Sequence, residues 1–412
     1  RAQTEDALVH RINLAQALAL AAQHNPELSA ADLGQQAARA QAQQQGLLPN
    51  PELAYSQEGV PSSAGRSQSL QINWPLELGG KRAARNAVAE REAELAAAKA
   101  SGIRARVRTE VVHAYFALLL AQEGQRLAQS HAQLAQNAAQ AVDKRVAAGK
   151  VSPVEHSRAL AAQATAQAQA QAAQAALRSA QAQLAVLLGQ AATTRLEAAD
   201  HALESPNLAA LPDLPQPPPL AALQAQLEQS PALQSAQLER ARSQAQLQLA
   251  RSARWPDVGL SLGVKRTADA PASRNQLLLG FSVPLPLFNR QQGALQAAVL
   301  ADDQAREQAR ASALQAGQAL LQAYGQYESA RAQNQLLQTQ ALPAAHSAYR
   351  AAGLGFEYGK FSFLELLDAQ RSYLAVQEQI LQTQSQAYRA LADMEALLGQ
   401  PINAGLPTTS KK

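Results

Sequence analysis

The sequence predicts a mainly α-helical protein that also contributes a few β-strands to a sheet, and three observations predict it. Long tracts consist of Ala, Gln and Leu, residue types that favour helices. A set of landmarks occurs twice along the chain, in the same order. Each half also contains two short segments in which apolar residues alternate with small or polar ones, as in half-buried β-strands.

Composition limits both the class of protein and its chemistry. Of the 412 residues, 47% are hydrophobic but only 4% aromatic, which suits helices packed through small residues. Cysteine is absent, so disulfides, thiolate metal sites and cysteine nucleophiles are excluded. The net charge of +4 is too small to indicate a nucleic-acid partner. The sequence contains no run of 18 apolar residues, so we expect no transmembrane helix. Membrane-spanning β-strands are shorter, and this observation does not exclude them.

The internal duplication determines the expected architecture. Five landmarks of the first half recur in the second half, in order and at a nearly constant spacing. The pairs are Asn25-Pro26-Glu27-Leu28 with Ser230-Pro231-Ala232-Leu233, Pro51-Glu52-Leu53 with Pro256-Asp257-Val258, residues 74–78 with 283–287, residues 149–155 with 359–365, and Leu187-Leu188-Gly189 with Leu397-Leu398-Gly399.

We therefore expect residues 1–204 to form a first structural repeat and residues 220–400 a second one. A Pro-rich linker at 205–219 separates them, and 401–412 is a C-terminal tail. Each repeat should hold a helix pair, two strands and a long helical hairpin. The strands are expected at about 51–59, 67–77, 256–266 and 275–286, and the hairpins at about 80–188 and 289–398.

The hairpin helices are too long for an ordinary compact domain. Residues 80–148 contain no proline and, at about 1.5 Å per residue, would extend about 100 Å. The corresponding stretch 289–356 contains Pro343, where we expect a kink. In the last helix, apolar residues repeat every seven positions along two seams, and a third seam continues through Gln370, Gln377 and Gln384. Seams this wide predict contacts with neighbours on two sides, as in a coiled or tube-like body.

The alternating segments are typical of membrane strands. Tilted segments of about 10–12 residues span a hydrocarbon layer. The two tryptophans, Trp74 and Trp255, fall at the same end of the expected hairpins and suit one interfacial aromatic belt. A soluble hairpin packed on the helices is the alternative. The apolar sets are Leu70, Ile72, Trp74 and Leu76; Val258, Leu260, Leu262 and Val264; and Leu277, Leu279, Phe281, Val283 and Leu285.

Four strands cannot close a barrel, and open sheet edges are not tolerated in lipid, so a membrane location requires an oligomer. Two copies would give eight strands with a filled interior, and three would give twelve with room for a lumen. The second face of the strands is rich in Gly, Ser, Gln and Asn, which favours an open lumen.

The whole chain resembles the outer-membrane factor family, the TolC-like exit ducts of tripartite efflux pumps and of type I secretion. The duplication, the Asn25-Pro26-Glu27-Leu28 opening, the strand pairs and above all residues 359–371 carry the resemblance. The run Pro75-Leu76-Glu77-Leu78-Gly79-Gly80-Lys81-Arg82 is similar to the branch that exports heavy-metal cations. The resemblance implies a homotrimer with a twelve-stranded barrel in the outer membrane and a long α-helical tunnel in the periplasm. It also implies a periplasmic adaptor protein and a proton-driven inner-membrane RND pump as partners.

The resemblance further assigns the helical tips. It implies a constriction lined by acidic residues, here Glu365 and Asp368, which are one helical turn apart, with Glu155 as the repeat-related acid. Three copies would form two acidic rings, which suggests a cation-sensitive gate. A solvated helix face is the alternative. Both glycines at the tips should end a long helix and turn the chain. The implied adaptor-docking residues are Gly149, Lys150, Ser152, Gly359, Lys360 and Ser362.

Other motifs indicate no chemistry. The GxSxG pattern at 259–263 lies inside an alternating segment, whereas a nucleophile elbow requires a strand-to-helix turn. The seven histidines form no i,i+4 pair, and the chain has one Met and no Cys, so we expect no metal site and no cofactor. No polar constellation indicates an enzyme. Lys81 and Arg82, which follow the second strand, are candidates for contact with outer-membrane lipid headgroups, whereas a solvated helix face is expected for the other basic residues, Arg85, Arg104, Arg106 and Arg108. The predicted function is a passive metal-cation exit duct; alternatives are a multidrug or type I secretion duct, or a soluble coiled-coil scaffold or adaptor.

Overall fold

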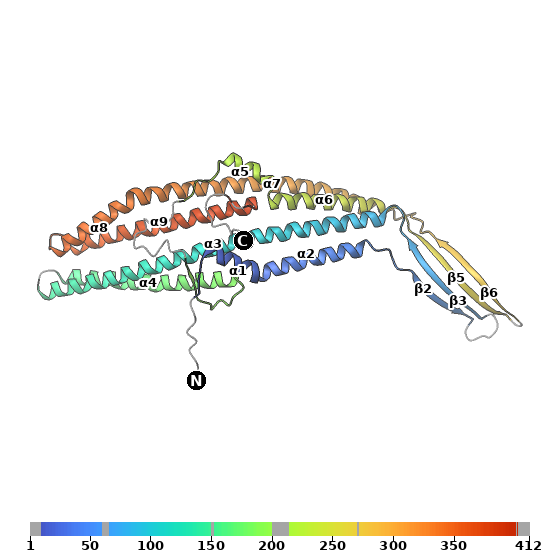
Figure 1. The fold of residues 1–412 in the computed structure, drawn as a ribbon, viewed down its shortest axis with the longest axis horizontal. Coiled ribbons are helices and arrows are strands. Elements are labelled where there is room, and N and C mark those ends of the chain that lie inside the picture. The colour runs from blue at the N-terminus through green and yellow to red at the C-terminus, as the bar shows by residue number, and fades with distance from the viewer. Residues whose placement is uncertain are drawn as a thin grey trace, which may run out of the picture. The chain divides into compact units, whose positions relative to one another are not determined.

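The computed structural model describes residues 10–59, 66–149, 152–199, 214–269, 272–400 and 402 (Figure 1). In the first half, a short strand and two helices precede a pair of strands and two long helices. These elements are β1 (His10–Ile12), α1 (Leu14–His24), α2 (Pro26–Gln45), β2 (Glu52–Glu58), β3 (Arg66–Leu76), α3 (Lys81–Ala147), α4 (Pro153–Leu187) and β4 (Leu196–Ala198).

The second half has the same order of helices and long strands. Its elements are α5 (Leu220–Leu227), α6 (Pro231–Ser252), β5 (Val258–Asp269), β6 (Ala272–Ser282), α7 (Gln292–Leu336), the π-helical turn η3 (Leu337–Ala341), α8 (Leu342–Glu357) and α9 (Phe363–Leu398). Figure 1 shows α8 and α9 as an antiparallel pair. Within the described part of the chain, no helix combines the length and the apolarity that crossing a membrane requires.

The long helices form where the Ala- and Gln-rich tracts predict them. The 67 residues of α3 give a helix of about 100 Å at 1.5 Å per residue. The counterpart stretch is interrupted at η3, which ends two residues before Pro343. Proline has no N–H to continue the α-helical ladder, and a π turn shifts the hydrogen-bonding register at this point. A kink was predicted at Pro343; the structure shows a change of helix type over Leu337–Ala341.

The sheet is antiparallel throughout, in the order β2-β3-β5-β6. β3 and β5 pair along eleven positions from Arg66 opposite Ala268 to Leu76 opposite Val258. β6 ends at Ser282, four residues before the expected end at 286. Pro284 and Pro286 follow, and proline cannot donate to a strand ladder, so the alternation of Val283 and Leu285 continues beyond the strand itself.

A second, parallel sheet was not predicted. It pairs β1 with β4, three residues each, from His10 opposite Leu196 to Ile12 opposite Ala198. Strands of three residues are too short to show a period-two pattern, so the sequence contained no periodicity that identifies them.

The contacts divide the chain into two units. We call Arg1–Ala30, Gly102–Pro231 and Gln315–Lys412 the tip unit, and Ala31–Ser101 with Ala232–Leu314 the sheet unit. The tip unit has a core of large side chains, which includes the fully buried Tyr115, Leu184, Tyr327, Ile380 and Met394. In the sheet unit, the buried helical residues include Val88, Ala89, Leu95, Ala100 and Leu247.

The wide seams predicted on α9 are buried in part, and Leu366, Tyr373, Leu374 and Tyr388 are half-buried. In the first seam, Ile380, Ala387 and Met394 are fully buried. In the second seam, Leu367 and Leu381 are less than 10% exposed. The glutamine seam is buried as well, with Gln370, Gln377 and Gln384 at 5–6% exposure. A helix covered along three lines packs against more than one neighbour, which the heptad analysis predicted.

Candidate functional site

One face of the sheet is apolar and uncovered in the single chain. Directly opposed residues of antiparallel strands lie on the same face, so the register assembles the apolar side chains into cross-strand rows. All of them are between 43% and 80% exposed. The rows are Tyr55, Leu70, Val264 and Leu277; Leu53, Ile72, Leu262 and Leu279; and Trp74, Leu260 and Phe281. We call this the apolar face. The apolar face is a continuous patch, whereas exposed apolar residues on ordinary protein surfaces are scattered singly.

The opposite face of the sheet carries small and polar residues. Ser56 and Ser69 share a hydrogen bond of 2.7 Å between their hydroxyls. A Cβ atom added at Gly263 would lie 2.6 Å from the Leu70 carbonyl oxygen and from Gln71 Cγ. The glycine is therefore required by close packing between neighbouring strands. We call this the small-residue face.

The two tryptophans lie at the same end of the sheet. Trp74 belongs to β3 near its end at Leu76, and Trp255 precedes Val258, the residue opposite Leu76. Trp74 is 43% exposed and Trp255 is 62% exposed. Gly79, with φ of +69°, approaches Trp255 so closely that an added Cβ would lie 2.7 Å from its ring. This end is the one from which the chain enters α3, as the order of elements requires.

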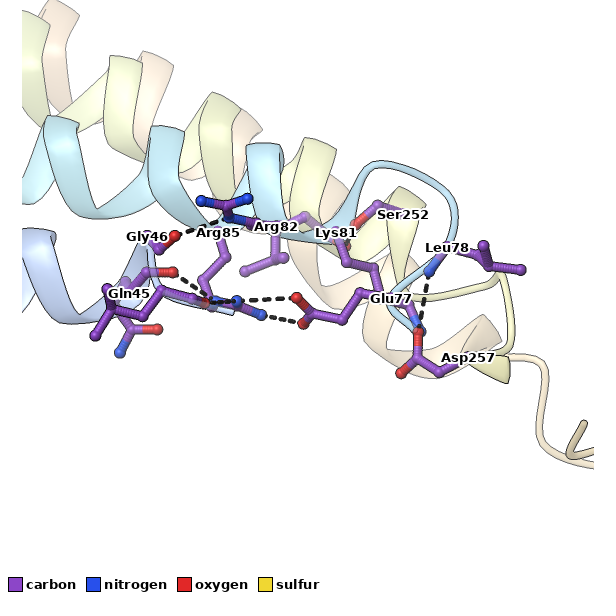
Figure 2. Close-up of polar contacts among 11 residues, drawn as sticks. Gln45, Gly46, Glu77, Leu78, Lys81, Arg82, Arg85, Ser252 and Asp257 are labelled. Atoms are coloured by element: carbon purple, nitrogen blue, oxygen red, sulfur yellow. Dashed lines mark hydrogen bonds and ion pairs between the residues drawn. The ribbon is translucent and has the colours of Figure 1, made fainter. Parts of the chain in front are cut away.

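A polar network connects this end of the sheet to the helices of the sheet unit (Figure 2). Arg85 of α3 donates to both carboxylate oxygens of Glu77 and to the carbonyl oxygens of Gln45 and Leu47. Arg82, almost one turn earlier, donates to the carbonyl oxygen of Gly46 at 2.8 Å. The two guanidinium groups thus satisfy carbonyls at the C-terminal end of α2. Sequence analysis did not identify Arg85 and Glu77 as a pair.

Lys81 is also part of this network. Its Nζ lies 2.7 Å from Asp257 Oδ1, and the same oxygen accepts a hydrogen bond from the backbone N–H of Leu78. The Lys81 side chain is only 16% exposed. The contact of Lys81 and Arg82 with lipid headgroups stays a prediction, although the Lys81 ammonium group already has a partner in Asp257 within the chain. These residues are 176 positions apart, which sequence spacing alone does not reveal.

Both helical hairpins of the tip unit turn at a glycine. Gly149 and Gly359 have φ of +68° and +70°, in the left-handed region that favours glycine. After α8, Gly359 N–H donates to the Phe356 carbonyl and Lys360 N–H to the Gly355 carbonyl. This is the Schellman pattern of helix termination. The predicted role of both glycines in ending a long helix is confirmed, whereas Lys150 lies outside the described residues.

Serines cap the return helices. Ser152 Oγ accepts from Val154 N–H at the start of α4, where Pro153 occupies the first turn. Ser362 and Glu365 form a reciprocal capping box at the start of α9: Ser362 Oγ accepts from Glu365 N–H, and Glu365 Oε2 accepts from Ser362 N–H at 2.6 Å. The spacing Ser-x-x-Glu at 362–365 could have predicted this cap.

The three acidic candidates differ in their surroundings. Glu365 and Asp368 are exposed in the single chain, but the Glu365 carboxylate folds back onto its own helix start. Glu155 is partly buried and lies in the first turn of α4. Next to Glu155, His156 Nε2 is 3.4 Å from Asp143 Oδ1 of α3.

An arginine links the two hairpin ends. Arg145 of α3 donates from Nη2 to the Phe356 carbonyl oxygen at 2.7 Å, and its guanidinium lies 4.0 Å from the centre of the Phe356 ring. Phe356 is buried together with Val142, Ala159 and Leu367. A cation at the C-terminal end of α8 is favourable because that end carries partial negative charge. Sequence analysis did not identify this link.

Ionisable groups also join α3 to α9 within the tip unit. His113 Nε2 lies 3.1 Å from Asp393 Oδ1 and 3.2 Å from the Arg389 carbonyl oxygen. The hydrogen bond with Asp393 raises the pKa of His113 above its usual value, although burial opposes it. Burial likewise raises the pKa of Glu395, against the opposing effect of Arg108 at 3.5 Å.

A groove of about 740 Å³ runs over α3 between α4 and α9. Small α3 residues such as Ala117, Ala121 and Gly124 line the groove together with His131. Burial and the nearby Arg371 lower the pKa of His131. Among the residues that the structure describes, no group of three or more His, Cys, Asp or Glu side chains is placed to hold a metal ion.

Comparisons with known proteins agree with this architecture. A family model described as "Outer membrane efflux protein" matches residues 17–190 and 222–400. The chain is 39% identical over 389 residues to the cobalt-zinc-cadmium resistance protein CzcC of Cupriavidus metallidurans, covering 94% of this chain and 90% of CzcC. It is 30% identical over 303 residues to the nickel-cobalt-cadmium resistance protein NccC of Alcaligenes xylosoxydans xylosoxydans, covering 72% of this chain and 65% of NccC.

A solved structure of CusC, described in terms of transmembrane channel formation, superimposes with a TM-score of 0.78. It is 20% identical and covers 95% of this chain and 94% of CusC, so it bears on the fold. The family match extends over most of the chain, and the family consists of transport proteins rather than enzymes. The chain belongs to the outer membrane efflux protein family, and so acts in the outer membrane and extends into the periplasm.

Proposed function

We propose that three copies of this chain form an exit duct for divalent metal cations, with a shared twelve-stranded barrel in the membrane and a helical tunnel below it. The observation that carries this proposal is the apolar face, which the single chain leaves uncovered on a sheet with two open edges. Lipid covers such a face, and only a closed ring of strands satisfies the edges there.

The edge strands are β2 and β6. In the proposed barrel, β6 of one copy pairs with β2 of the next. Twelve strands leave a lumen, whereas eight have an interior that side chains fill. The small-residue face would line this lumen. From Leu70 to Leu76, β3 extends about 20 Å at about 3.3 Å per residue. Flanking apolar residues extend the apolar face towards the roughly 25 Å band of membrane barrels.

We further propose that the chain consists of two structural repeats, 1–204 and 220–400, joined by the linker 205–219 and followed by the tail 401–412. The repeated order of helices and long strands supports this division. The ends of the repeats and most of the linker lie outside the described residues. Trp74 and Trp255 would form the aromatic belt on the periplasmic side, because they lie at the end where the sheet meets α3.

The cargo is proposed from the relatives. CzcC and NccC are named for resistance to cobalt, zinc, cadmium and nickel. The described residues offer no cluster of metal ligands, which suits a path that releases its cargo. In this proposal, an inner-membrane RND pump supplies energy and selectivity, and a periplasmic adaptor docks at the hairpin ends around Gly149, Lys150, Ser152, Gly359, Lys360 and Ser362.

We propose that Glu365, Asp368 and Glu155 form the cation-sensitive gate. Three copies would bring each acid into a ring, as in cation channels. Two carboxylates about 6 Å apart repel by roughly 0.7 kcal/mol in water-like surroundings, and cations relieve this repulsion. Because the Glu365 carboxylate also caps α9, its replacement by Ala would remove a cap together with the charge.

The gate is tested best with the double variant Glu365→Gln/Asp368→Asn. Gln retains the reciprocal capping geometry and removes the charge. We expect the concentration of Co²⁺ that blocks half the single-channel current to rise about threefold or more. Asp303→Asn, an exposed acid of α7 in the sheet unit, should leave block unchanged. Equal block in the double variant and the original protein would reject the acidic gate.

The cargo is tested in cells. Deleting the coding sequence should sensitise cells to Co²⁺, Zn²⁺ or Cd²⁺ and raise their accumulation, and the restored chain should reverse both effects. A matched panel of organic antibiotics and detergents serves as the control. Unchanged metal tolerance with a new sensitivity to organic compounds would contradict the metal assignment and leave the outer-membrane duct in place.

A further inference from the structure

The apolar face carries charge at one end only. Along the four strands, the residues on this face include two charged side chains among those described, and both are arginines, Arg66 and Arg266. Both lie at the end of the sheet opposite Trp74, where β2 connects to β3 and β5 connects to β6. We call this end the outer end.

The register places the two arginines close together. Arg266 is opposite Gln68 on β3 and Asn275 on β6, and Gln57 of β2 continues the same row. This polar row directly follows the apolar row of Leu70 and Val264. Arg66 lies two residues beyond Gln68 on β3, so it is a diagonal neighbour of Arg266, at about 7–8 Å between Cα atoms.

Neither arginine is neutralised by the described residues. No hydrogen bond or ion pair joins Arg66 or Arg266 to another side chain of the described part of the chain, and the Arg66 Nε has no acceptor there. The small-residue face differs at the same level: Lys265 Nζ lies 3.2 Å from Glu58 Oε2. Two like charges on neighbouring strands are unfavourable, so an anion placed between them would be stabilising.

We propose that Arg66 and Arg266 bind phosphate groups of lipids in the outer leaflet. This inference rests on the proposed function, because it requires that the apolar face contacts lipid. The apolar rows then lie in the hydrocarbon layer, and the arginines emerge at the level of the headgroups. Guanidinium binds phosphate through paired hydrogen bonds, which suits a phosphomonoester better than a neutral headgroup. Trp74 and Trp255 mark the other boundary, so the two ends of the barrel would prefer different headgroups.

The test counts lipids bound to the purified full-length protein by native mass spectrometry. The probe is bisphosphorylated lipid A, compared with the same lipid after removal of its phosphates. We expect the original protein to prefer the phosphorylated form by about tenfold or more, and Arg66→Gln/Arg266→Gln to reduce the preference to about twofold or less. Arg274→Gln is the matched control, because Arg274 is opposite Thr267 at the same level on the small-residue face.

The remaining outcomes separate the inference from the proposed function. Equal loss in Arg274→Gln, or displacement of the lipid by millimolar inorganic phosphate, would overturn the lipid site. The same preparations are inserted into phosphatidylcholine bilayers for conductance. If the original protein conducts but shows no preference for phosphorylated lipid, the inference fails and the duct stands. If it neither inserts nor conducts, the proposed function fails and the inference fails with it.

Discussion

At the scale of single residues, Arg85 has the largest number of polar contacts at the junction of sheet and helices. It binds Glu77 and two carbonyl oxygens from the end of α2 and the residues after it, and its side chain is 27% exposed. We expect Arg85→Ala to lower the free energy of unfolding by about 1–3 kcal/mol, because Glu77 would lose its partner while only 16% exposed.

The matched control is Arg91→Ala on the same helix. Arg91 forms an exposed i,i+3 pair with Glu94, so its loss should change stability by less than about 0.5 kcal/mol. Heat-induced loss of the helical circular dichroism signal in detergent measures both variants. Equal effects of the two substitutions would contradict the structural role assigned to Arg85.

The His113–Asp393 contact makes a pH-dependent contribution. The pKa of His113 is raised in the folded chain, chiefly by Asp393, so folding favours the protonated ring. This contribution is complete below the unfolded pKa of about 6.5 and is lost as pH rises through the higher folded value. Asp393→Asn should therefore reduce the melting temperature more at about pH 5.5 than at about pH 8.5.

Glu395 also has a raised pKa, but this residue is present in both the original protein and the Asp393→Asn variant. Its contribution to the pH dependence therefore cancels when the two are compared. Arg389, which faces His113 and opposes its protonation, cancels in the same way. If the melting temperatures of the two proteins differ by the same amount at both pH values, His113 does not titrate against Asp393 in the folded chain.

Residue patterns predicted some of these sites and missed others for a physical reason. Gly149 and Gly359 were identified because the left-handed conformation at the end of a helix favours glycine, so the residue type at one position reveals it. The Ser362–Glu365 cap was visible in the spacing, but Ser362 was interpreted as an adaptor-docking residue and Glu365 as part of an acidic constriction. Lys81 with Asp257 and Arg145 with Phe356 are partners far apart in sequence, so their contacts depend on the fold as a whole.

At the scale of elements, the hairpin ends depend on backbone conformation. Gly359 adopts φ of +70°, whereas Gly353, inside α8, has no neighbour within 4 Å of an added Cβ and lies in helical conformation. Gly359→Ala should lower stability by about 1 kcal/mol or more, because a Cβ is disfavoured in the left-handed region. Gly353→Ala should be neutral or stabilising.

Denaturant unfolding of the two variants side by side measures this difference. A Gly359→Ala protein as stable as Gly353→Ala would show that the turn after α8 does not require glycine. The four strands and long helices followed from periodicity, because apolar alternation and Ala-rich tracts extend over many residues. The exact end of β6 and the π turn at Leu337–Ala341 depended on single prolines, and β1 and β4 were too short to produce a pattern.

At the scale of the whole molecule, a single chain leaves large apolar side chains of its sheet exposed. Aromatic residues are scarce in the sequence, yet Tyr55, Trp74 and Phe281 lie on the uncovered apolar face. The helices of the tip unit bury their large side chains within the chain, whereas the sheet exposes its own. The hydrophobic effect therefore favours covering the sheet, and the unpaired edges β2 and β6 favour further strands on either side.

The most direct measurement of this account is a disulfide cross-link between the two sheet edges of different copies. The chain contains no cysteine, so introduced pairs have no background. Ala54→Cys on β2 is combined in turn with Gln276→Cys, Leu278→Cys and Gly280→Cys on β6, all on the small-residue face. We predict that at least one pair yields a covalent ring of three chains after oxidation in membranes, and that Ala54→Cys alone does not. Covalent species that end at two chains, or chains that remain uncrosslinked in every pair, would contradict the account.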